Sequence, residues 1–470
     1  MRLNLFDDRT DSALVIRSKS NLNYKEHRTM NQIKGIKAAL NKSIKTVCQS
    51  PMDYCRNPKK DFTRRKKLPM DKVIKTILGF SSKSLNNEMI DIFSGNTEMP
   101  SASALVQQRS KILPTAFEDI FKEFTTLMNP IKLCDGYRLL AVDGSDIHTP
   151  TNPDDPDSCC QVKDHSPYNL YHLNALYDLC SHTYLDAVVQ KRKNWNEHRA
   201  LCNMVDRYDS SLPTIFIADR GYESYNSMAH IQQIGQLFLF RIKDINSCGM
   251  LRGFDLPDEE EFDFSVSLAL TNKSSNLAKS LCKDRNRFRY IPPTSTFDFL
   301  PSKSKKADPM SFFKLSFRIV RFEIVPDKYV VLATNLPVDS FPTDKLKYLY
   351  SLRWGIETSF RSLKYTIGLL YFHSKKPEHI IQEIFAKLTM YNYTELIAAS
   401  ISIRNAVRKL IYRINFSAAA NVCRKFFLGF CTPNFVEAVI QKNILPIRSL
   451  KGKPRLLKSK RAVSFLYRVA

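Results

Sequence analysis

The sequence predicts an α/β protein in which a mixed-sheet core is interrupted by a β-rich insertion, with helical regions at both ends. Changes in apolar spacing carry this prediction. Apolar residues recur at three and four positions from about residue 69 to residue 126, as in helices, and short continuous apolar runs follow, as in buried strands. Alternating stretches begin near residue 243, and a helical period returns after Pro342.

This pattern divides the 470 residues into six predicted segments, enough for several units because one core rarely grows beyond about 300 residues. The segments are a basic N-terminal segment (1–68), a helical domain (69–130), the first part of the core (131–242), the insertion (243–340), the second part of the core (341–400) and a helical, basic C-terminal region (401–470).

Positive charge is concentrated at the two ends of the chain. The net charge is +25; residues 1–70 hold 17 basic and 6 acidic side chains, and residues 441–470 hold 9 basic and none acidic. Basic arms suit a polyanion, because each neutralised phosphate releases counterions. We therefore expect DNA contacts and interpret 69–130 as a DNA-end-binding domain, with a structural helical cap and solvated tails as the alternatives.

The helical domain begins at Pro69, and Ser101 is the expected N-cap of one of its helices. In the core, strands are expected at 138–142, 169–180 and 184–190, then a helix from Asn196, a strand at 214–218, a helix at 223–234 and a strand at 236–242. Three strands, a helix, a strand, a helix and a strand form the ribonuclease-H-like order, in which carboxylates at adjacent strand ends can meet. Strand-like stretches at 262–270, 312–325 and 328–336 make up the insertion.

A helix expected over 344–364 carries Tyr350, Arg353, Glu357 and Lys364 on one face, beside an apolar stripe that should dock it on the sheet. A surface helix with an ion pair four residues apart would look similar. Asp143 and Asp219 each end an apolar strand, where a charge has no packing role, although either could cap the following turn.

Three carboxylates from two strand ends and one helix meet the needs of two Mg²⁺ ions, or Mn²⁺ as a substitute. Such ions take hard oxygen ligands, activate an attacking oxygen and stabilise a leaving one. We therefore expect Asp143, Asp219 and Glu357 to be both catalytic and metal-binding.

The motif resembles that of DDE transposases of bacterial insertion-sequence family 4, whose signature spaces Tyr, Arg, Glu and Lys as in YSLRWGIETSFRSLK. AVDGSDI and IADRGY match the family blocks around the first and second Asp. The resemblance covers about residues 60–400. It implies a homodimeric enzyme that cuts and rejoins double-stranded DNA at terminal inverted repeats and inserts it into target DNA. It also implies that Tyr350, Arg353 and Lys364 hold phosphates, and Arg220, beside Asp219, is a further DNA-contact candidate or a structural ion pair.

Two alternatives to a transposase stay open: a transposase-derived DNA-binding protein without activity, and a ribonuclease-H-like nuclease that uses the same metals. Glu197 could support the site indirectly or simply occupy the positive end of a helix dipole, and Asp146 and His148 match no metal motif.

Eleven cysteines without ribbon spacing and nine unclustered histidines argue against zinc. With no membrane-length apolar run and no signal peptide, we expect a cytoplasmic, nucleoid-associated protein.

Overall fold

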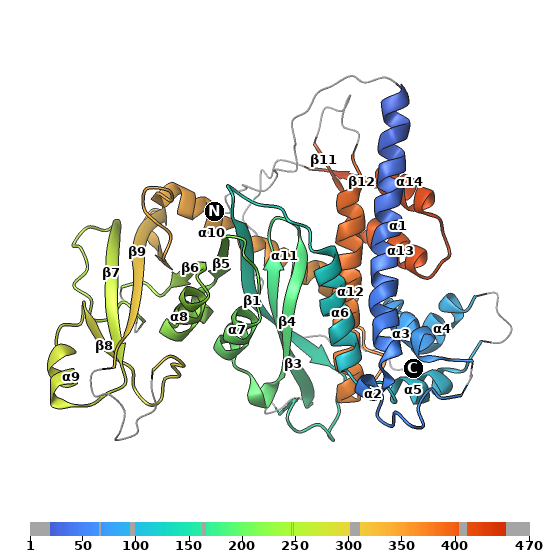
Figure 1. The fold of residues 1–470 in the computed structure, drawn as a ribbon, viewed down its shortest axis with the longest axis horizontal. Helices are drawn as coiled ribbons and strands as arrows, with labels where there is room; N and C mark the ends of the chain where they lie inside the picture. The colour runs from blue at the N-terminus through green and yellow to red at the C-terminus, as the bar shows by residue number, and fades with distance from the viewer. Residues whose placement is uncertain are drawn as a thin grey trace.

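The chain folds as a mixed α/β protein, in which one large sheet meets a helical region on one side (Figure 1). The computed structural model describes residues 19–64, 67–94, 99–161, 166–245, 247, 249–300, 311–403 and 411–447, with side chains from residue 28 onward. Residues 1–18 and 448–470, which are parts of the two basic ends, therefore lie outside the described residues.

The centre of the sheet follows the predicted order of strands. It contains β1 (Arg138–Thr149), β3 (Tyr168–Asp178), β4 (Thr183–Lys191), β5 (Thr214–Ala218) and β6 (Leu237–Ile242). The strands lie in the order β4-β3-β1-β5-β6; β3 pairs antiparallel with β1 and β4, and β5 pairs parallel with β1 and β6. Helices α7 (Glu197–Asp206) and α8 (Tyr225–Gln233) follow β4 and β5, and the short β2 (Cys159–Cys160) pairs with β3.

The prediction that the first strand ends on Asp143 was wrong. β1 continues through Asp143 to Thr149, because its antiparallel partner β3 is long and pairs with it from Leu140↔Asp178 to Thr149↔Asn169. Only the parallel pairing with β5 stops near the aspartate, at Val142↔Ala218. An apolar run shows only the buried part of a strand. The polar half of β1, from Asp143 onward, could therefore not be recognised from the apolar run.

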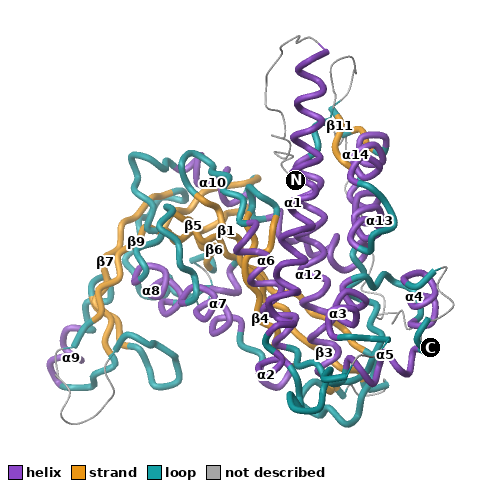
Figure 2. The backbone as a smooth tube through the Cα atoms, turned by 45° about the vertical axis from the view of Figure 1, so that its right-hand side comes forward, coloured by secondary structure: helices purple, strands orange, loops and turns teal. Residues whose placement is uncertain are grey.

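The strands expected in the insertion extend the same sheet. They are β7 (Phe262–Thr271), β8 (Phe288–Tyr290), β9 (Phe313–Val325) and β10 (Lys328–Thr334), with the short helix α9 (Asn276–Leu281). β10 pairs antiparallel with β6, and β9 and β7 follow outward, so these strands form the arm at the far end of the molecule from the helices (Figure 2). The boundaries of this segment as a domain stay a prediction.

Apolar side chains alternate across the central strands and fill a core on each face of the sheet. On β1, Leu139 and Ala141 pack into the core shared with the long helix α12 (Pro377–Ser400), whereas Leu140 and Val142 pack toward α7 and α8. Successive strand residues point to opposite faces, so this alternation also fixes which way Asp143 points. It shares the face of Leu139 and Ala141.

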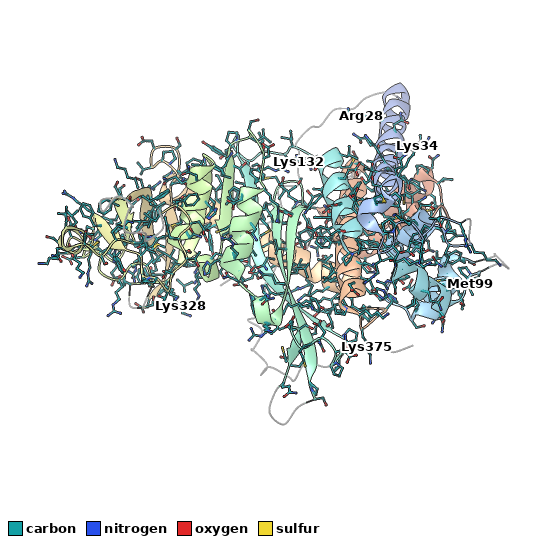
Figure 3. All side chains as sticks on the ribbon, turned by 60° about the horizontal axis from the view of Figure 1, so that its bottom comes forward. Arg28, Lys34, Met99, Lys132, Lys328 and Lys375 are labelled. Carbon is teal, nitrogen blue, oxygen red and sulfur yellow. The ribbon has the colours of Figure 1, made fainter. Side chains whose placement is uncertain are left out.

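The basic N-terminal segment contains a long helix that the sequence reading missed. Helix α1 (Lys19–Gln49) buries Ile33, Ile36, Leu40, Ile44 and Val47 against the helical core. Their spacing of three and four residues is a helical stripe that the surrounding lysines obscured. Arg28 and Lys34 lie toward the upper end of α1 in the view of Figure 3.

The helices expected within 69–130 are present. After α2 (Pro51–Tyr54) come α3 (Met70–Leu78), α4 (Leu85–Ile92), α5 (Ala102–Arg109) and α6 (Thr115–Met128). Ser101 caps α5 as predicted, accepting a hydrogen bond from the Ala104 N–H at 3.2 Å. The buried Arg109 at the end of α5 pairs with Glu383 of α12 at 2.8 Å, which joins this region to the core helix.

The signature segment is not the single continuous helix that its periodicity predicted. It forms α10 (Thr343–Leu352) and α11 (Trp354–Arg361), followed by a π-helical turn, η3 (Ser362–Thr366). The chain tightens at Arg353, where the Arg353 N–H donates to the carbonyl of Tyr350 and the Ile356 N–H donates to that of Arg353. Arg353 therefore lies at the junction of α10 and α11, Glu357 lies in α11, and Lys364 lies in the π-helical turn, so the four signature residues do not share one regular helix.

In the described part of the C-terminal region, two helices lie between the two strands of a small antiparallel sheet. This part contains β11 (Tyr412–Ile414), α13 (Phe416–Phe427), α14 (Pro433–Lys442) and β12 (Ile444–Pro446), and β11 pairs with β12. Among the helices of the described segments, none combines the length and apolar character needed to span a membrane.

Candidate active site

Asp143 and Asp219 are neighbours because of the register between β1 and β5. The last parallel pair is Val142↔Ala218, so the next residue on each chain is one of the two aspartates. Asp219 then caps the short helical turn η2 (Arg220–Tyr222), accepting a hydrogen bond from the Arg220 N–H at 2.7 Å. The two aspartates therefore occupy neighbouring positions where the parallel pairing of β1 with β5 ends, which is the placement that the sequence predicted.

Arg353 holds Glu357, on helix α11, close to Asp143 because its guanidinium contacts both carboxylates. The Arg353 guanidinium donates from Nη2 to Oε1 of Glu357 at 2.6 Å, and its Nη1 lies 3.5 Å from Oδ2 of Asp143. Arg353 is only 4% exposed, so this bridge is buried beneath the carboxylates. Gly355 allows α11 to pack closely against Leu179, the residue after β3, since a Cβ at position 355 would lie 2.9 Å from the Leu179 side chain.

Tyr350 and Arg241 contact the second aspartate. The Tyr350 hydroxyl donates to Oδ1 of Asp219 at 3.2 Å, and Nη1 of Arg241 lies 3.9 Å from the same oxygen. Burial, together with the charge of Asp219, raises the pKa of Tyr350 to about 12, so the phenol keeps its proton at neutral pH. Arg241 lies on β6 and was not singled out from the sequence, where it is one arginine in an apolar strand.

Negative charge accumulates in this site. Burial raises the pKa of Asp143 to about 6, the charges of Glu357 and Asp219 contribute, and Arg353 only partly offsets them. Burial alone would lower the pKa of Arg353, but Tyr350, Asp219 and Asp143 raise it above its ordinary value. Arg353 therefore stays cationic as a counter-charge in a site that would accommodate further positive charge.

The other two predicted DNA contacts lie in different surroundings. Lys364 is half-buried, and its Nζ donates to the backbone carbonyl of Asp146 at 2.7 Å, which ties η3 to the strand that carries Asp143. Arg220 is exposed directly beside Asp219. The structure thus brings Tyr350 and Arg353 into contact with the three carboxylates, places the ammonium group of Lys364 against the strand that carries Asp143, and leaves Arg220 at the surface.

A second group of polar residues near the aspartates was largely missed by sequence reasoning. His172 on β3 lies between two carboxylates, with Nδ1 2.8 Å from Asp146 and Nε2 2.9 Å from Glu197. The ring of Trp195 stacks on His172 with 4.1 Å between centroids. Only the cross-strand register, in which Asp146 pairs with His172, reveals this grouping, and no local motif does.

Within the described part of the chain, no three His, Cys, Asp or Glu side chains are gathered closely enough to hold a metal ion. At the three carboxylates the guanidinium of Arg353 supplies the positive charge between Asp143 and Glu357. The donors nevertheless fit a divalent cation chemically: they are hard carboxylate oxygens, and burial, followed by the charges of Glu357 and Asp219, raises the pKa of Asp143.

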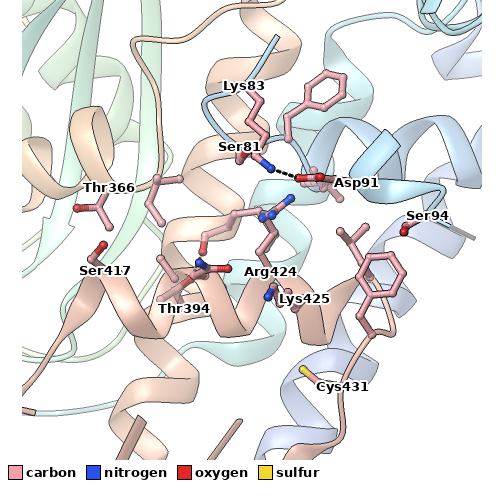
Figure 4. Close-up of a pocket in the computed structure, with 18 of the residues that line it drawn as sticks. Ser81, Lys83, Asp91, Ser94, Thr366, Thr394, Ser417, Arg424, Lys425 and Cys431 are labelled. Carbon is pink, nitrogen blue, oxygen red and sulfur yellow. Dashed lines mark hydrogen bonds and ion pairs between the residues drawn. The ribbon is translucent and has the colours of Figure 1, made fainter. Parts of the chain in front are cut away.

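A cavity of about 930 Å³ lies elsewhere, between the segment joining α3 to α4 and helix α13 (Figure 4). Lys83, Asp91, Arg424 and Lys425 line it, and Lys83 pairs with Asp91. None of the three carboxylates, Asp143, Asp219 and Glu357, lines this cavity. This cavity lies between N-terminal and C-terminal helices, apart from the carboxylate cluster.

Most of the chain, including the carboxylate cluster, lies in a segment that matches a known protein family. The family "Transposase DDE domain" matches residues 135–393, which include every residue of the carboxylate cluster. A protein named as a transposase, InsL of insertion sequence element IS186A from Escherichia coli K12, is 26% identical over 198 residues, covering 39% of this chain and 51% of that protein. The chain thus spans about half the length of this relative.

A longer match is to transposase InsG of insertion sequence element IS4 from Escherichia coli K12. It is 22% identical over 344 residues and covers 70% of both chains. Among solved structures, a piggyBac transposase synaptic complex with hairpin DNA gives a TM-score of 0.40 at 10% identity, covering 89% of this chain and 81% of that one, which is too low to define a shared fold. Because the family match spans more than half of the sequence and contains the cluster, the chain belongs to the DDE transposase domain family.

Proposed function

We propose that this protein is a DNA transposase that moves an insertion sequence by cutting and rejoining DNA at the ends of the element. The observation that carries the proposal is the convergence of Asp143, Asp219 and Glu357 around Arg353 and Tyr350, within the segment that matches the transposase domain. The central strand order supports a ribonuclease-H-like core, and the insertion is the β-rich arm that extends it.

Asp143, Asp219 and Glu357 would hold the divalent cations, for which we propose Mg²⁺, with Mn²⁺ as a substitute. When bound, such ions activate an attacking oxygen and stabilise the leaving oxygen at phosphorus. Arg353 contacts two of the three carboxylates, so it would have to yield part of its contacts as the cations bind. Tyr350 and the Arg220 N–H fix the orientation of the Asp219 carboxylate.

DNA would approach the site from the exposed side of the carboxylates. Arg220 is the exposed cation beside Asp219, and a guanidinium offers two parallel donors to phosphate oxygens. Arg353, Tyr350 and Lys364 are proposed to take phosphate contacts once they are released from their present partners. The basic residues of α1, including Arg28 and Lys34, suit the flanking duplex.

The partners we propose are double-stranded DNA with terminal inverted repeats, a target DNA, and a second copy of the chain that pairs the two ends. The helices within 69–130 are the proposed end-binding domain, because they lie beside the basic segment. Action at the nucleoid follows from this function.

An end-cleavage assay tests the proposal. The full-length protein is incubated with Mg²⁺ and DNA that carries the native sequences flanking the coding region, and strand breaks are mapped on a sequencing gel. We expect cleavage at the element ends with wild type, and loss of cleavage with retained end binding in Asp143→Asn, Asp219→Asn and Glu357→Gln.

Glu378→Gln is the matched control for Glu357→Gln. Each glutamate lies on a helix and accepts a 2.6 Å contact from an arginine, Arg56 for Glu378 and Arg353 for Glu357, but Glu378 lies outside the cluster. Cleavage should persist in the control. If wild-type protein binds the ends without breaking a strand, the protein is a DNA-binding protein and not a transposase. If it cleaves the ends but never joins them to other DNA, it is a nuclease.

A further inference from the structure

Gly144, the residue after Asp143, has no space for a side chain. A Cβ at this position would lie 2.3 Å from Nε2 of His172 and 2.7 Å from Oε1 of Glu197. Successive residues of a strand point to opposite faces, so Asp143 points toward Arg353 while the backbone of Gly144 is covered by His172 and Glu197 on the other face. The two side chains thus pack directly against the strand that presents the first aspartate.

Glu197 also reaches the segment that carries the second aspartate. Its other carboxylate oxygen, Oε2, would be 3.6 Å from a Cβ at Gly221, two residues after Asp219. One carboxylate therefore lies between the two backbone segments that carry Asp143 and Asp219. Any shift of Glu197 would alter the separation of these segments.

The position of Glu197 is itself fixed by its surroundings. It is the first residue of α7, whose cap Asn196 accepts a hydrogen bond from the Arg199 N–H at 2.9 Å and donates its own N–H to Gln190 at 3.1 Å. The positive end of a helix favours a carboxylate there. The helix dipole therefore explains why the charge of Glu197 is tolerated at this position. The contacts of Glu197 with His172 and with the backbone at Gly144 show which part of the site its carboxylate faces.

His172 connects Glu197 to the signature helix. Burial alone would lower the pKa of His172, but the carboxylates of Asp146 and Glu197 outweigh this effect and raise it, which favours the imidazolium. The carbonyl of Asp146 accepts a hydrogen bond from Lys364 at 2.7 Å. A chain of polar contacts thus runs from Lys364 through Asp146 and His172 to Glu197, crossing the strand of Asp143.

A second observation in this region is the buried hydroxyl of Tyr222. Its hydroxyl is buried, with 2% of the residue exposed, and has no hydrogen-bond partner among the described residues. Burial, and then the charges of Glu197, Asp143 and Asp219, raise the pKa of Tyr222, so its hydroxyl lies within electrostatic reach of all three carboxylates. A buried hydroxyl without a hydrogen-bond partner is destabilising and rare in folded proteins, so its presence here calls for an explanation.

We infer that Glu197 and His172 are positioning residues, which hold the segments of Asp143 and Asp219 at the separation that cation binding requires. The inference rests on the proposed function for its consequence in DNA cleavage. Glu197 acts through the backbone and touches neither substrate nor cation. Outer partners of this kind typically change metal affinity or activity by about 10- to 100-fold when they are removed.

The test compares Glu197→Gln with Asp206→Asn in the full-length protein. Asp206 is the matched control because it lies on the same helix and contacts another histidine, His230, at 2.6 Å, away from the aspartates. Mn²⁺ binding to metal-free protein is measured by calorimetry without DNA, and end cleavage is measured separately at saturating Mn²⁺. We expect Glu197→Gln to weaken Mn²⁺ binding about 10-fold or more and to slow cleavage, and Asp206→Asn to stay within about twofold of wild type.

Mn²⁺ affinity of Glu197→Gln within about twofold of wild type would overturn the inference. If this variant does not fold, Glu197→Asp replaces it, since it keeps the charge and withdraws the carboxylate from Gly144; wild-type affinity there would equally overturn the inference. Weakened Mn²⁺ binding in a protein that never cleaves DNA would instead leave the positioning role standing and reject the proposed transposase activity.

Discussion

Asp143→Asn should make the metal-free protein more stable while removing its activity. The folded state raises the pKa of Asp143 from 3.8 to about 6, chiefly by burial. A carboxyl group with a raised pKa contributes its full stability below about pH 4, and this contribution is lost as the pH rises through 6. At neutral pH wild type therefore carries a buried charge that the amide does not.

The magnitude follows from the shift. About two pKa units correspond to about 3 kcal/mol at pH 8, and the same titration leaves roughly half of that at pH 5. The amide oxygen can still accept the hydrogen bond from the Gly144 N–H at 2.9 Å, but Arg353 loses its charge partner at 3.5 Å. We therefore expect a net gain of about 1 to 3 kcal/mol at pH 8.

Urea unfolding in EDTA at pH 8 and pH 5, followed by circular dichroism, measures this gain. Added Mg²⁺ should stabilise wild type and have little effect on the variant, because a ligand stabilises only the state that binds it. An Asp143→Asn protein that is no more stable than wild type at pH 8, or whose advantage is the same at pH 5, would refute the reasoning about buried charge.

Three further predictions concern the surroundings of the site and the helical core. Tyr350→Phe removes the 3.2 Å hydrogen bond to Asp219 and should slow end cleavage about 5- to 10-fold with end binding retained; an unchanged single-turnover rate would contradict this. EDTA should stop cleavage and leave end binding intact in a gel-shift assay, whereas cleavage that survives chelation would exclude the metal mechanism. Burial would raise the pKa of Glu383, but His373 and Arg109 hold it at about 2, so wild type should lose about 3 kcal/mol as the pH falls from about 4.5 to 2. In Glu383→Gln the free energy of unfolding, measured in urea, should fall less between about pH 4.5 and 2. An equal fall in the variant and wild type would show that the pair of Glu383 with Arg109 and His373 does not cause the acid sensitivity.

Much of the central fold could be predicted because its signals are local. The buried run 214–218 and the alternating stretches of β7, β9 and β10 report their strands directly, and Ser101 reports the start of α5. Helix α1 was not predicted because lysines interrupt its buried apolar stripe, so the composition indicated only a basic segment. The extension of β1 escaped because pairing with β3, and not burial, keeps its polar half extended.

The candidate site divides in the same way. Asp143, Asp219 and Glu357 could be found because the sequence places each of them in a recognisable block, and the structure brings their neighbourhoods together through Arg353 and Tyr350. Contacts such as His172 with Glu197 depend on how β3 and α7 pack in space, which no local pattern encodes. The ion pair of Arg353 with Glu357 could be anticipated from their spacing of four residues, but the contact of Arg353 with Asp143 could not.

The central claim is that Asp143, Asp219 and Glu357 share divalent cations, and anomalous scattering from crystals of the DNA-end complex grown with Mn²⁺ tests it most directly. We expect Mn²⁺ peaks within about 2.5 Å of oxygens from all three side chains, with Arg353 moved from between Asp143 and Glu357. Peaks bound elsewhere, or a complex with DNA in place and one of the three carboxylates far from every ion, would contradict the account.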